Sequence, residues 1–316
     1  MLAPSLLVAL LAAVPGEPPP ESAVKPVKVV QVPQYSEGIV FDHDGNGYIS
    51  HGKVITQIRG LSGGGNITTR VWAETGAPNG HKVLADGTHL VCDAGQHAVL
   101  HLDADGKMLP PAAKECDGKP LRGPNDLCLD PQGGFYFTDP GDSSAKNPIG
   151  TVHYVDPQGK THLVAGGLAY SNGIVLRPDG KTLLVAESQH NRVLAYPVLS
   201  PGKVGERSIF VNLPTKEGEQ IDNQPDGMCL DEAGNLYVAH YGMRQVQVVS
   251  PEGKVIRRYS AGTLTTSNVA FGGPNRDQLF VTGALGKEQG SPGALFRLDL
   301  KGVQGLAILP KRQEKR

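Results

Sequence analysis

Six short segments of the chain begin with an acidic or amide residue and share one pattern. They begin at Glu37, Asn79, Asn125, Asn172, Asp226 and Asn268. In the first five, a glycine stands eight residues after the first residue, at Gly45, Gly87, Gly133, Gly180 and Gly234. Carboxylate and carboxamide oxygens are the ligands that hard cations such as Ca²⁺ prefer. If the fold gathers these side chains, they can form an oxygen-lined cation site.

The spacing of the segments indicates how they could be gathered. Their first residues are 42, 46, 47, 54 and 42 positions apart, a period typical of propellers and solenoids. A solenoid of this period usually contains helices, and no stretch of about 12 or more residues has helical periodicity. The repeat therefore favours a propeller.

Each segment reads as a hairpin. In residues 172–187, two apolar runs flank the turn Pro-Asp-Gly-Lys, and such turns are strong hairpin signals. Two more apolar runs follow in each repeat, as in 151–165 and 246–260, giving the content of one propeller blade. The sequence thus predicts an all-β, six-bladed β-propeller with four-stranded antiparallel blades around a central channel. Residues 27–32 are expected to complete the last blade, which ends with 294–302.

Composition and the termini bound the class of protein. The chain has 316 residues and a net charge of −1, with no basic stripe that would favour nucleic acid. Residues 1–16 resemble a signal peptide, because their apolar run of about 13 residues is too short to span a bilayer. We expect an exported protein with a flexible lead-in at 17–26, the propeller at 27–310 and a tail at 311–316.

In a propeller, a residue just ahead of the innermost strand lies at one mouth of the channel. The six first residues should therefore converge there, two of them anionic and four of them neutral amides. This set suits one Ca²⁺, whereas Mg²⁺ demands a tighter octahedron and Zn²⁺ prefers His or Cys. The alternative is that each is an ordinary turn former, as Asn and Asp before Gly often are. Glu37 is a poor turn former, which favours the cation site.

Five segments resemble the senescence-marker-protein, gluconolactonase and luciferin-regenerating-enzyme-like family. They are residues 36–38, 123–140, 171–188, 225–242 and 267–284, and they span nearly the whole expected propeller. The resemblance implies a six-bladed propeller with one divalent cation in the channel mouth, usually Ca²⁺, with Mg²⁺, Mn²⁺ or Zn²⁺ also open. It places the metal ligands at Glu37, Asn125, Asn172 and Asp226. Family members typically hydrolyse lactones, and relatives of the fold hydrolyse phosphotriesters.

Catalytic and substrate-binding roles follow as hypotheses. Asp226 is the candidate general base toward water, or the nucleophile itself, and these two roles stay open. His81 follows Asn79-Gly80 near the same mouth and is a candidate proton shuttle. The candidate substrate-binding residues are Arg122, Asn79, Asn125 and Asn268.

Other polar residues and the cysteines are expected to be structural. Asp139, Glu187 and His240 end the second strands of their segments, and we expect them to lie away from the site. Three of the four cysteines lie on predicted strands and read as small buried apolar residues. In an exported protein, Cys92 could instead pair with Cys116.

Three functions remain as hypotheses. The first is an exported, Ca²⁺-dependent hydrolase that opens a sugar-derived or similar lactone, acting as a monomer on a small molecule. The second is a phosphotriesterase or arylesterase on the same scaffold. The third is a propeller that binds a partner and holds a purely structural ion, which resemblance of fold alone does not exclude.

Overall fold

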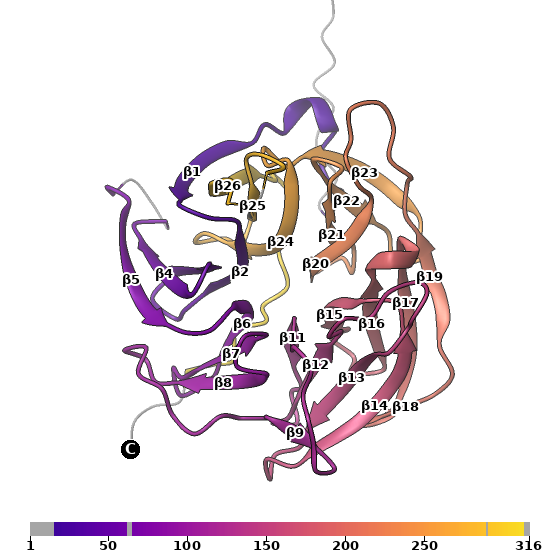
Figure 1. The fold of residues 1–316 in the computed structure, drawn as a ribbon. Helices are drawn as coiled ribbons and strands as arrows, with labels where there is room; N and C mark the ends of the chain where they lie inside the picture. Colours follow the sequence, from indigo (N-terminus) through magenta and orange to yellow (C-terminus); the bar gives the residue numbers. More distant parts are fainter. Residues whose placement is uncertain (1–15, 62–64, 289, 313–316) are drawn as a thin grey trace, which may run out of the picture.

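The computed structural model describes residues 16–61, 65–288 and 290–312, and it confirms the six-bladed propeller. The sheets radiate from a central channel, and their first strands β2, β6, β11, β15, β20 and β24 surround it in Figure 1. Neighbouring first strands contact one another around the whole circle. The repeat read from the sequence therefore corresponds to one blade.

Blades 1 to 3 are built from consecutive strands. Blade 1 contains β2 (Ser36–Phe41), β3 (Gly47–His51), β4 (Val54–Arg59) and β5 (Thr68–Glu74). Blade 2 contains β6 (Pro78–Val83), β7 (His89–Asp93) and β8 (Ala98–Leu102). Blade 3 contains β11 (Leu127–Leu129), β12 (Phe135–Asp139), β13 (Gly150–Val155) and β14 (Thr161–Leu168). A small hairpin, β9 (Glu115–Cys116) and β10 (Lys119–Pro120), lies between blades 2 and 3 in the sequence.

Blades 4 to 6 complete the ring. Blade 4 contains β15 (Ser171–Leu176), β16 (Thr182–Glu187), β17 (Arg192–Ser200), β18 (Lys203–Val204) and β19 (Ser208–Asn212). Blade 5 contains β20 (Gln224–Leu230), β21 (Leu236–Tyr241), β22 (Gln245–Val249) and β23 (Val255–Ser260). Blade 6 contains β24 (Thr265–Gly272), β25 (Gln278–Ala284), β26 (Gly293–Asp299) and β1 (Val27–Val32). The short 3₁₀ helices are η1 (Glu21–Ala23) and η2 (Ser188–His190).

Two details qualify the predicted blades. The outermost strand of blade 6 is β1, which pairs antiparallel with β26 and closes the ring as expected. Blade 2 departs from the four-stranded pattern, because only isolated bridges, Val99 with Ala113 and Leu102 with Met108, stand where a fourth strand was expected. Its outer chain turns back too irregularly to form a continuous ladder.

The core consists of six apolar clusters, each packed between two adjacent blades. Between blades 1 and 2, for example, Tyr48, Ile55 and Trp72 pack against Val83 and Val91. Because strand side chains alternate between the two faces of a sheet, each blade presents apolar residues to both neighbours. Packing between blades thus fixes the ring and the positions of the first strands.

The two ends of the channel differ. We call the end at which the first strands begin the upper end, and the other the lower end. The C-terminal segment, residues 303–310, crosses the lower end: the Leu306 amide donates to the Leu230 carbonyl, and Leu309 packs on the cluster between blades 1 and 2. His43 bonds the Pro310 carbonyl at 2.8 Å. The lower end is therefore covered by the chain itself.

The segment before β1 has specific contacts. The Arg257 guanidinium forms an ion pair with Glu17 at 3.0 Å, the Tyr259 hydroxyl donates to the Pro19 carbonyl, and Val24 is buried between blades 5 and 6. Residues 17–24, expected as a flexible lead-in, lie along the outer edge of blade 5. The expected signal peptide at 1–16, apart from Gly16, and residues 313–316 of the expected tail lie outside the described residues.

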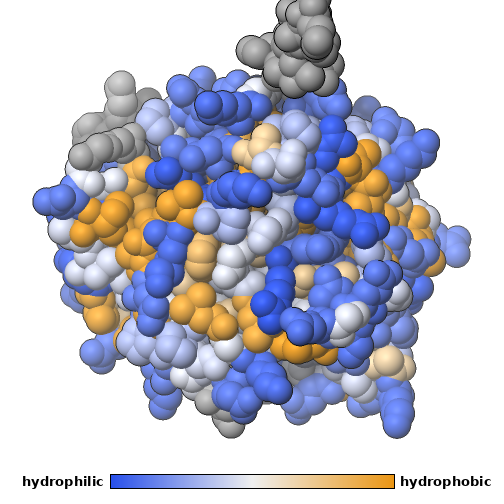
Figure 2. Space-filling model, turned by 90° about the horizontal axis from the view of Figure 1, so that it is seen from above, coloured by the Kyte–Doolittle hydropathy of each residue, from blue (hydrophilic) through white to orange (hydrophobic). Residues whose placement is uncertain are grey.

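The side of the ring is mostly hydrophilic in Figure 2, with apolar side chains in separate patches. Within the described ranges, we find no helix of the length and apolarity needed to cross a membrane.

Candidate functional site

Three of the four predicted ligands lie at irregularities in the first strands, and the fourth, Asn125, lies just ahead of β11. The pairing register shifts between Glu37 and Val40 in β2, between Ser171 and Ile174 in β15, and between Pro225 and Met228 in β20. Each shift contains the first residue of a segment and the glycine after it. Bulges of this kind re-aim a side chain out of the regular alternation. The alternative that these residue pairs form turns is wrong, because they lie within or beside the strands that line the channel.

The glycine after the first residue allows the blades to approach closely. A Cβ on Gly38 would lie 1.9 Å from the Asn79 carbonyl oxygen, and one on Gly173 would lie 2.2 Å from the Asp226 carbonyl oxygen. No side chain fits at such distances, so each glycine lets the next blade's first residue lie against its own strand. The recurring residue-glycine pair thus sets the radius of the channel mouth.

Hydroxyl groups fix the same backbone from the neighbouring blade. The Thr138 hydroxyl donates to the Asn172 carbonyl at 2.8 Å, and the Ser267 hydroxyl donates to the Ser36 carbonyl at 2.6 Å. These bonds run around the channel from one blade to the next. They hold the site residues on a rigid ring, and sequence reasoning missed them because nothing in a strand sequence marks which hydroxyl crosses to another blade.

Four side chains expected as metal ligands are buried at the upper end, and three of them have an unused oxygen atom. Glu37, Asn125, Asn172 and Asp226 are each no more than 7% exposed. Glu37 Oε2, Asn125 Oδ1 and Asn172 Oδ1 have no hydrogen-bond partner. Ser188 accepts from Asn172 Nδ2 at 3.2 Å, which leaves the amide oxygen as the free atom. Buried acceptors without donors are costly, so these oxygens are arranged for a group that is not part of the chain.

The pKa shifts of the two carboxyl groups indicate that the missing partner of these oxygens carries a positive charge. Burial raises the pKa of Glu37 to about 7, with the negative charge of Asp126 adding to the effect and a hydrogen bond from Tyr35 opposing it. Burial and the charges of Glu37 and Asp126 raise the pKa of Asp226 well above its ordinary range. Two buried carboxylates that repel each other are relieved by a cation.

The donor set fits a hard divalent cation. Two carboxylates and two amides supply only oxygen, as Ca²⁺ prefers. No group of three or more His, Cys, Asp or Glu side chains able to hold a metal lies within the described part of the chain. The site therefore depends on the amide oxygens of Asn125 and Asn172, and it lacks the nitrogen and sulfur ligands typical of Zn²⁺.

Asp126 and Lys82 form an ion pair beside the site that sequence reasoning missed. Lys82 Nζ lies 3.8 Å from Asp126 Oδ1, and the Asp126 side chain is almost fully buried. Asp126 directly follows the predicted ligand Asn125, and this adjacency was the one feature of the sequence that could have placed Asp126 near the site. Its charge acts on both Glu37 and Asp226.

Three tyrosines also surround the ligands. The Tyr35 hydroxyl donates to Glu37 Oε1 at 2.7 Å, and the rings of Tyr35 and Tyr241 meet edge to face with centroids 6.4 Å apart. Tyr170 directly precedes β15 and has a φ of 65°. Sequence reasoning missed all three, because the chain's low aromatic content gave no reason to expect aromatic residues at the mouth.

The other predicted substrate residues are only partly brought to this site. Asn268 is buried and its side chain interacts with Glu37, but its Oδ1 accepts the Val269 amide at 2.9 Å. Asn79 is partly exposed, and its carbonyl accepts the Ser50 hydroxyl. Neither has an unpartnered buried side-chain atom like those of Glu37, Asn125 and Asn172.

Arg122 is not among the residues that the fold brings together. Its side chain is exposed, and Nη1 donates to the Ile149 carbonyl. Its backbone amide donates to the Asp139 carboxylate. Arg122 therefore secures the turn ahead of Asn125.

His81 does not reach the cluster either. It is fully buried between blades 1 and 2, its Nε2 lies 2.8 Å from His89 Nδ1, and its ring stacks on Trp72. The expectation that His81 faces the mouth is wrong, because the bulge in β6 turns it into the interface between blades.

The expected positions of two other residues also change. His240 pairs with Pro225 in the ladder, so it lies at the upper end, with its ring bonded to the Asn191 side chain. Glu187 likewise pairs with Ser171. Antiparallel hairpins return the end of the second strand to the start of the first, which the expectation overlooked. They remain structural.

All four cysteines are free and buried. The expected alternative of a Cys92–Cys116 disulfide is not formed: Cys92 is buried in the cluster between blades 2 and 3, and Cys116 Sγ contacts the Thr161 carbonyl at 3.7 Å.

Comparison with known proteins agrees with this arrangement. Residues 36–285 match the SMP-30/Gluconolactonase/LRE-like region. The chain belongs to this family. Lactonase drp35 of Staphylococcus saprophyticus is 31% identical over 267 residues, which cover 78% of this chain and 77% of the relative. The family's match includes all four proposed ligands.

Two further relatives differ in their chemistry. The Gluconolactonase of Zymomonas mobilis is 30% identical over 207 residues, covering 61% of this chain and 57% of the relative, so the match spans little more than half of that protein. The Diisopropyl-fluorophosphatase of Loligo vulgaris is 28% identical over 246 residues, covering 69% and 76%.

Solved structures show the same fold. A luciferin-regenerating enzyme has a TM-score of 0.77 at 21% identity, covering 92% of this chain and 100% of the other. A gluconolactonase from Xanthomonas campestris has a TM-score of 0.74 at 24% identity, covering 92% and 97%.

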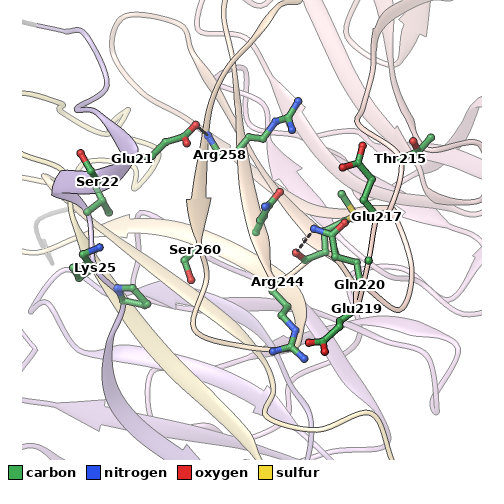
Figure 3. Close-up of a pocket in the computed structure, with 15 residues that line it drawn as sticks. Glu21, Ser22, Lys25, Thr215, Glu217, Glu219, Gln220, Arg244, Arg258 and Ser260 are labelled. Atoms are coloured by element: carbon green, nitrogen blue, oxygen red, sulfur yellow. Dashed lines mark hydrogen bonds between the residues drawn. The ribbon is translucent and has the colours of Figure 1, made fainter.

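A cavity of about 980 Å³ lies apart from this site, on the outside of blade 5 (Figure 3). It is lined by η1, the segment around Glu217 and the upper ends of β22 and β23. None of the four ligand residues lines it. Its charged side chains, such as Arg244 and Arg258, are exposed to solvent.

Proposed function

We propose that this protein is a divalent-cation-dependent hydrolase that opens a lactone to its hydroxy acid, with Ca²⁺ as the cation. The observation that carries the proposal is the set of buried, unpartnered oxygens on Glu37, Asn125 and Asn172 beside Asp226. Relatives named gluconolactonase, lactonase and pentonolactonase support the reaction class.

Glu37, Asn125, Asn172 and Asp226 would hold the cation. When bound, the cation supplies Lewis-acid polarisation of the substrate carbonyl and stabilises negative charge on its oxygen. The hydroxyl of Tyr35 holds Glu37 Oε1, which leaves Oε2 free for binding. Ser188 fixes the Asn172 amide in the same way.

Asp226 has the central part in the proposed reaction. Hydrolysis adds water across the acyl carbon–oxygen bond of the ring, so one proton must leave the water and one must reach the alcohol oxygen. The Asp226 carboxylate would either accept the proton from the attacking water or attack the carbonyl carbon itself. In the second case the ring carbon–oxygen bond would break, the alcohol oxygen would take up a proton, and water would then hydrolyse the anhydride on Asp226. Both roles need the buried position and the ionised form.

The test combines binding and turnover. The purified protein is freed of metal with EDTA, and Ca²⁺, Mg²⁺, Mn²⁺ or Zn²⁺ is added back singly over a panel of lactones and aryl esters in a pH-stat. We expect Ca²⁺ to restore lactone hydrolysis, and D226N to lose it while the thermal unfolding stays cooperative. Full activity of D226N would remove Asp226 from the reaction.

One specific observation favours a second candidate, a phosphotriesterase. The chain is 28% identical to a diisopropyl-fluorophosphatase over 76% of that relative, a coverage nearly equal to the 77% found for lactonase drp35. Turnover of a neutral phosphotriester and of no lactone in the same panel would establish this candidate instead. Tight cation binding with no turnover on any substrate would indicate a binding propeller with a structural ion.

Export and a monomeric state belong to the same proposal. Cells that express the whole chain should release a form that begins near residue 17, which the mass of the purified protein measures. Light scattering should give the mass of one chain, and intracellular protein of full length would contradict export.

A further inference from the structure

Three tyrosines form a collar at the upper end of the channel, each from a different blade. Tyr35 directly precedes β2, Tyr170 directly precedes β15, and Tyr241 ends β21, where it pairs with Gln224 at the start of β20. They therefore flank the strands that carry three of the four proposed ligands. All three are half-buried, so part of each side chain is open to solvent at the mouth.

The collar is fixed to the ligands at two of its members. The Tyr35 hydroxyl donates to Glu37 at 2.7 Å, and the Tyr241 ring packs edge to face on the Tyr35 ring. Within the described part of the chain, the hydroxyls of Tyr170 and Tyr241 form no hydrogen bond. Two phenol groups and exposed ring surface are therefore available at the mouth.

Tyr170 is held in an unusual conformation. Its φ of 65° lies in the left-handed region, which a bulky residue rarely adopts. The Ser143 hydroxyl accepts its amide at 2.9 Å, and its carbonyl accepts the Ser188 amide at 3.0 Å. Such strain is typically kept where it presents a side chain for function. Here it places Tyr170 within the field of Asp226 and Glu37.

The charges around the collar are negative. Besides the ligands, Asp142 acts on Tyr170 and Asp222 acts on Tyr241. Neither carboxylate lies within ion-pair distance of a basic side chain in the described part of the chain. One cation at the ligands offsets Glu37 and Asp226 but leaves these two rim charges. An anionic ligand would meet repulsion there.

We infer that the collar of Tyr35, Tyr170 and Tyr241 selects uncharged substrates that carry an apolar or aromatic body. The reacting carbonyl of the substrate lies at the proposed metal ligands, and the apolar or aromatic part of the substrate packs on the tyrosine rings. Aromatic faces bind apolar surface well, and the rim carboxylates disfavour substrates with a carboxylate or phosphate group. The same repulsion favours release of the hydroxy acid product. The inference deepens the proposed function and rests on it for the position of the carbonyl.

The experiment uses stable ligands, so that it does not depend on turnover. Binding of three δ-lactams to the Ca²⁺-loaded protein is measured by calorimetry: one unsubstituted, one with a phenyl group and one with a carboxymethyl group. We expect the phenyl lactam to bind about tenfold more tightly than the unsubstituted one. The carboxymethyl lactam should bind more weakly than its own methyl ester.

Variants assign the preference to the collar. Y241A and Y170A should each reduce the ratio of phenyl to unsubstituted affinity several-fold. Asn tolerates the left-handed region, so Y170N serves as a second variant if Y170A fails to fold. Y196F is the matched control, because the Tyr196 hydroxyl is buried in the core away from the mouth, and it should leave the ratio unchanged.

The outcomes separate the two proposals. Equal affinity for the phenyl and unsubstituted lactams, or a ratio unchanged in the Tyr170 and Tyr241 variants, overturns the collar even if lactones are hydrolysed. Tighter binding of the carboxymethyl lactam than of its ester overturns it as well. The expected preferences without hydrolysis of any lactone would support the collar and reject the proposed function.

Discussion

Replacing Glu37 by glutamine should stabilise the metal-free protein while removing its cation site. Burial and the charge of Asp126 raise the pKa of Glu37 from 4.5 to about 7 in the folded chain. A carboxyl group with a raised folded pKa weakens folding as pH rises, because the folded state holds a proton that the unfolded state has lost. The resulting loss of folding stability begins near pH 4.5 and is complete just above pH 7.

The size of the effect follows from the shift. A difference of about 2.5 pKa units corresponds to roughly 3 kcal/mol at 1.36 kcal/mol for each unit. Glutamine carries no charge, and its Oε1 can still accept the hydrogen bond from the Tyr35 hydroxyl. In EDTA at pH 8, E37Q should therefore have a free energy of unfolding up to about 3 kcal/mol above that of the parent. At pH 4.5 the two should be equal.

The assay is urea unfolding in EDTA across this pH range, followed by the same measurement in Ca²⁺. A ligand that binds only the folded state, present at about 1,000 times its dissociation constant, adds about 4.1 kcal/mol. The parent should gain this stability and E37Q should not, so the order of the two proteins reverses. E206Q is the matched control, because Glu206 is exposed. The reasoning is refuted if E37Q is less stable than the parent in EDTA at pH 8, or if their difference does not change with pH.

Three further results are expected. G173A should weaken Ca²⁺ binding by about tenfold or more, because the new Cβ would displace the Asp226 carbonyl; calorimetry measures this, with the exposed G166A as control. Burial lowers the pKa of His89 to about 4, so the Ca²⁺-loaded protein should lose up to roughly 3 kcal/mol of stability as pH falls from 6.5 to 4. H89N should show a shallower dependence in urea unfolding. The native protein should leave all four thiols unreactive toward a disulfide reagent, because each is buried with a raised pKa.

Each of these has a contrary outcome. Parental Ca²⁺ affinity in G173A would mean that the blades tolerate a wider channel. A pH dependence identical in H89N and the parent would assign the acid sensitivity to other groups. Rapid reaction of one thiol would show that a blade interface opens under native conditions.

The sequence repeat predicted the fold because each blade is built from the same local sequence features. A polar residue, a glycine and a hairpin turn recur at nearly constant spacing, and each feature has a local physical cause. The placement of the four proposed ligands at one end of the ring was predicted for the same reason, since the first position of each repeat becomes one position on the ring. Blade 2 was predicted less well, because the irregular return of its outer chain is not encoded in the hairpin signal.

The residues that sequence reasoning missed or misplaced depend on contacts between blades. His81 occupies a repeat position near the mouth, yet a bulge in β6 turns it toward Trp72 and His89. Tyr241 lies at the end of β21, the second strand of blade 5. Because β21 runs antiparallel to β20, this end lies beside the start of β20, at the mouth of the channel. Neither position follows from the pattern along one segment.

The pairing of β1 with β26 has a consequence for biogenesis. The sixth blade pairs β1, which precedes the strands of the other five blades, with β26, which follows them, so the circle stays open until β26 has been made. Until Gly293–Asp299 is available, β1 is an unpaired edge and the first blade lacks one neighbour. Edges of this kind invite pairing with other chains. A nascent chain of this protein should therefore remain a substrate for chaperones, or for any machinery that moves unfolded polypeptide, until β26 has been made.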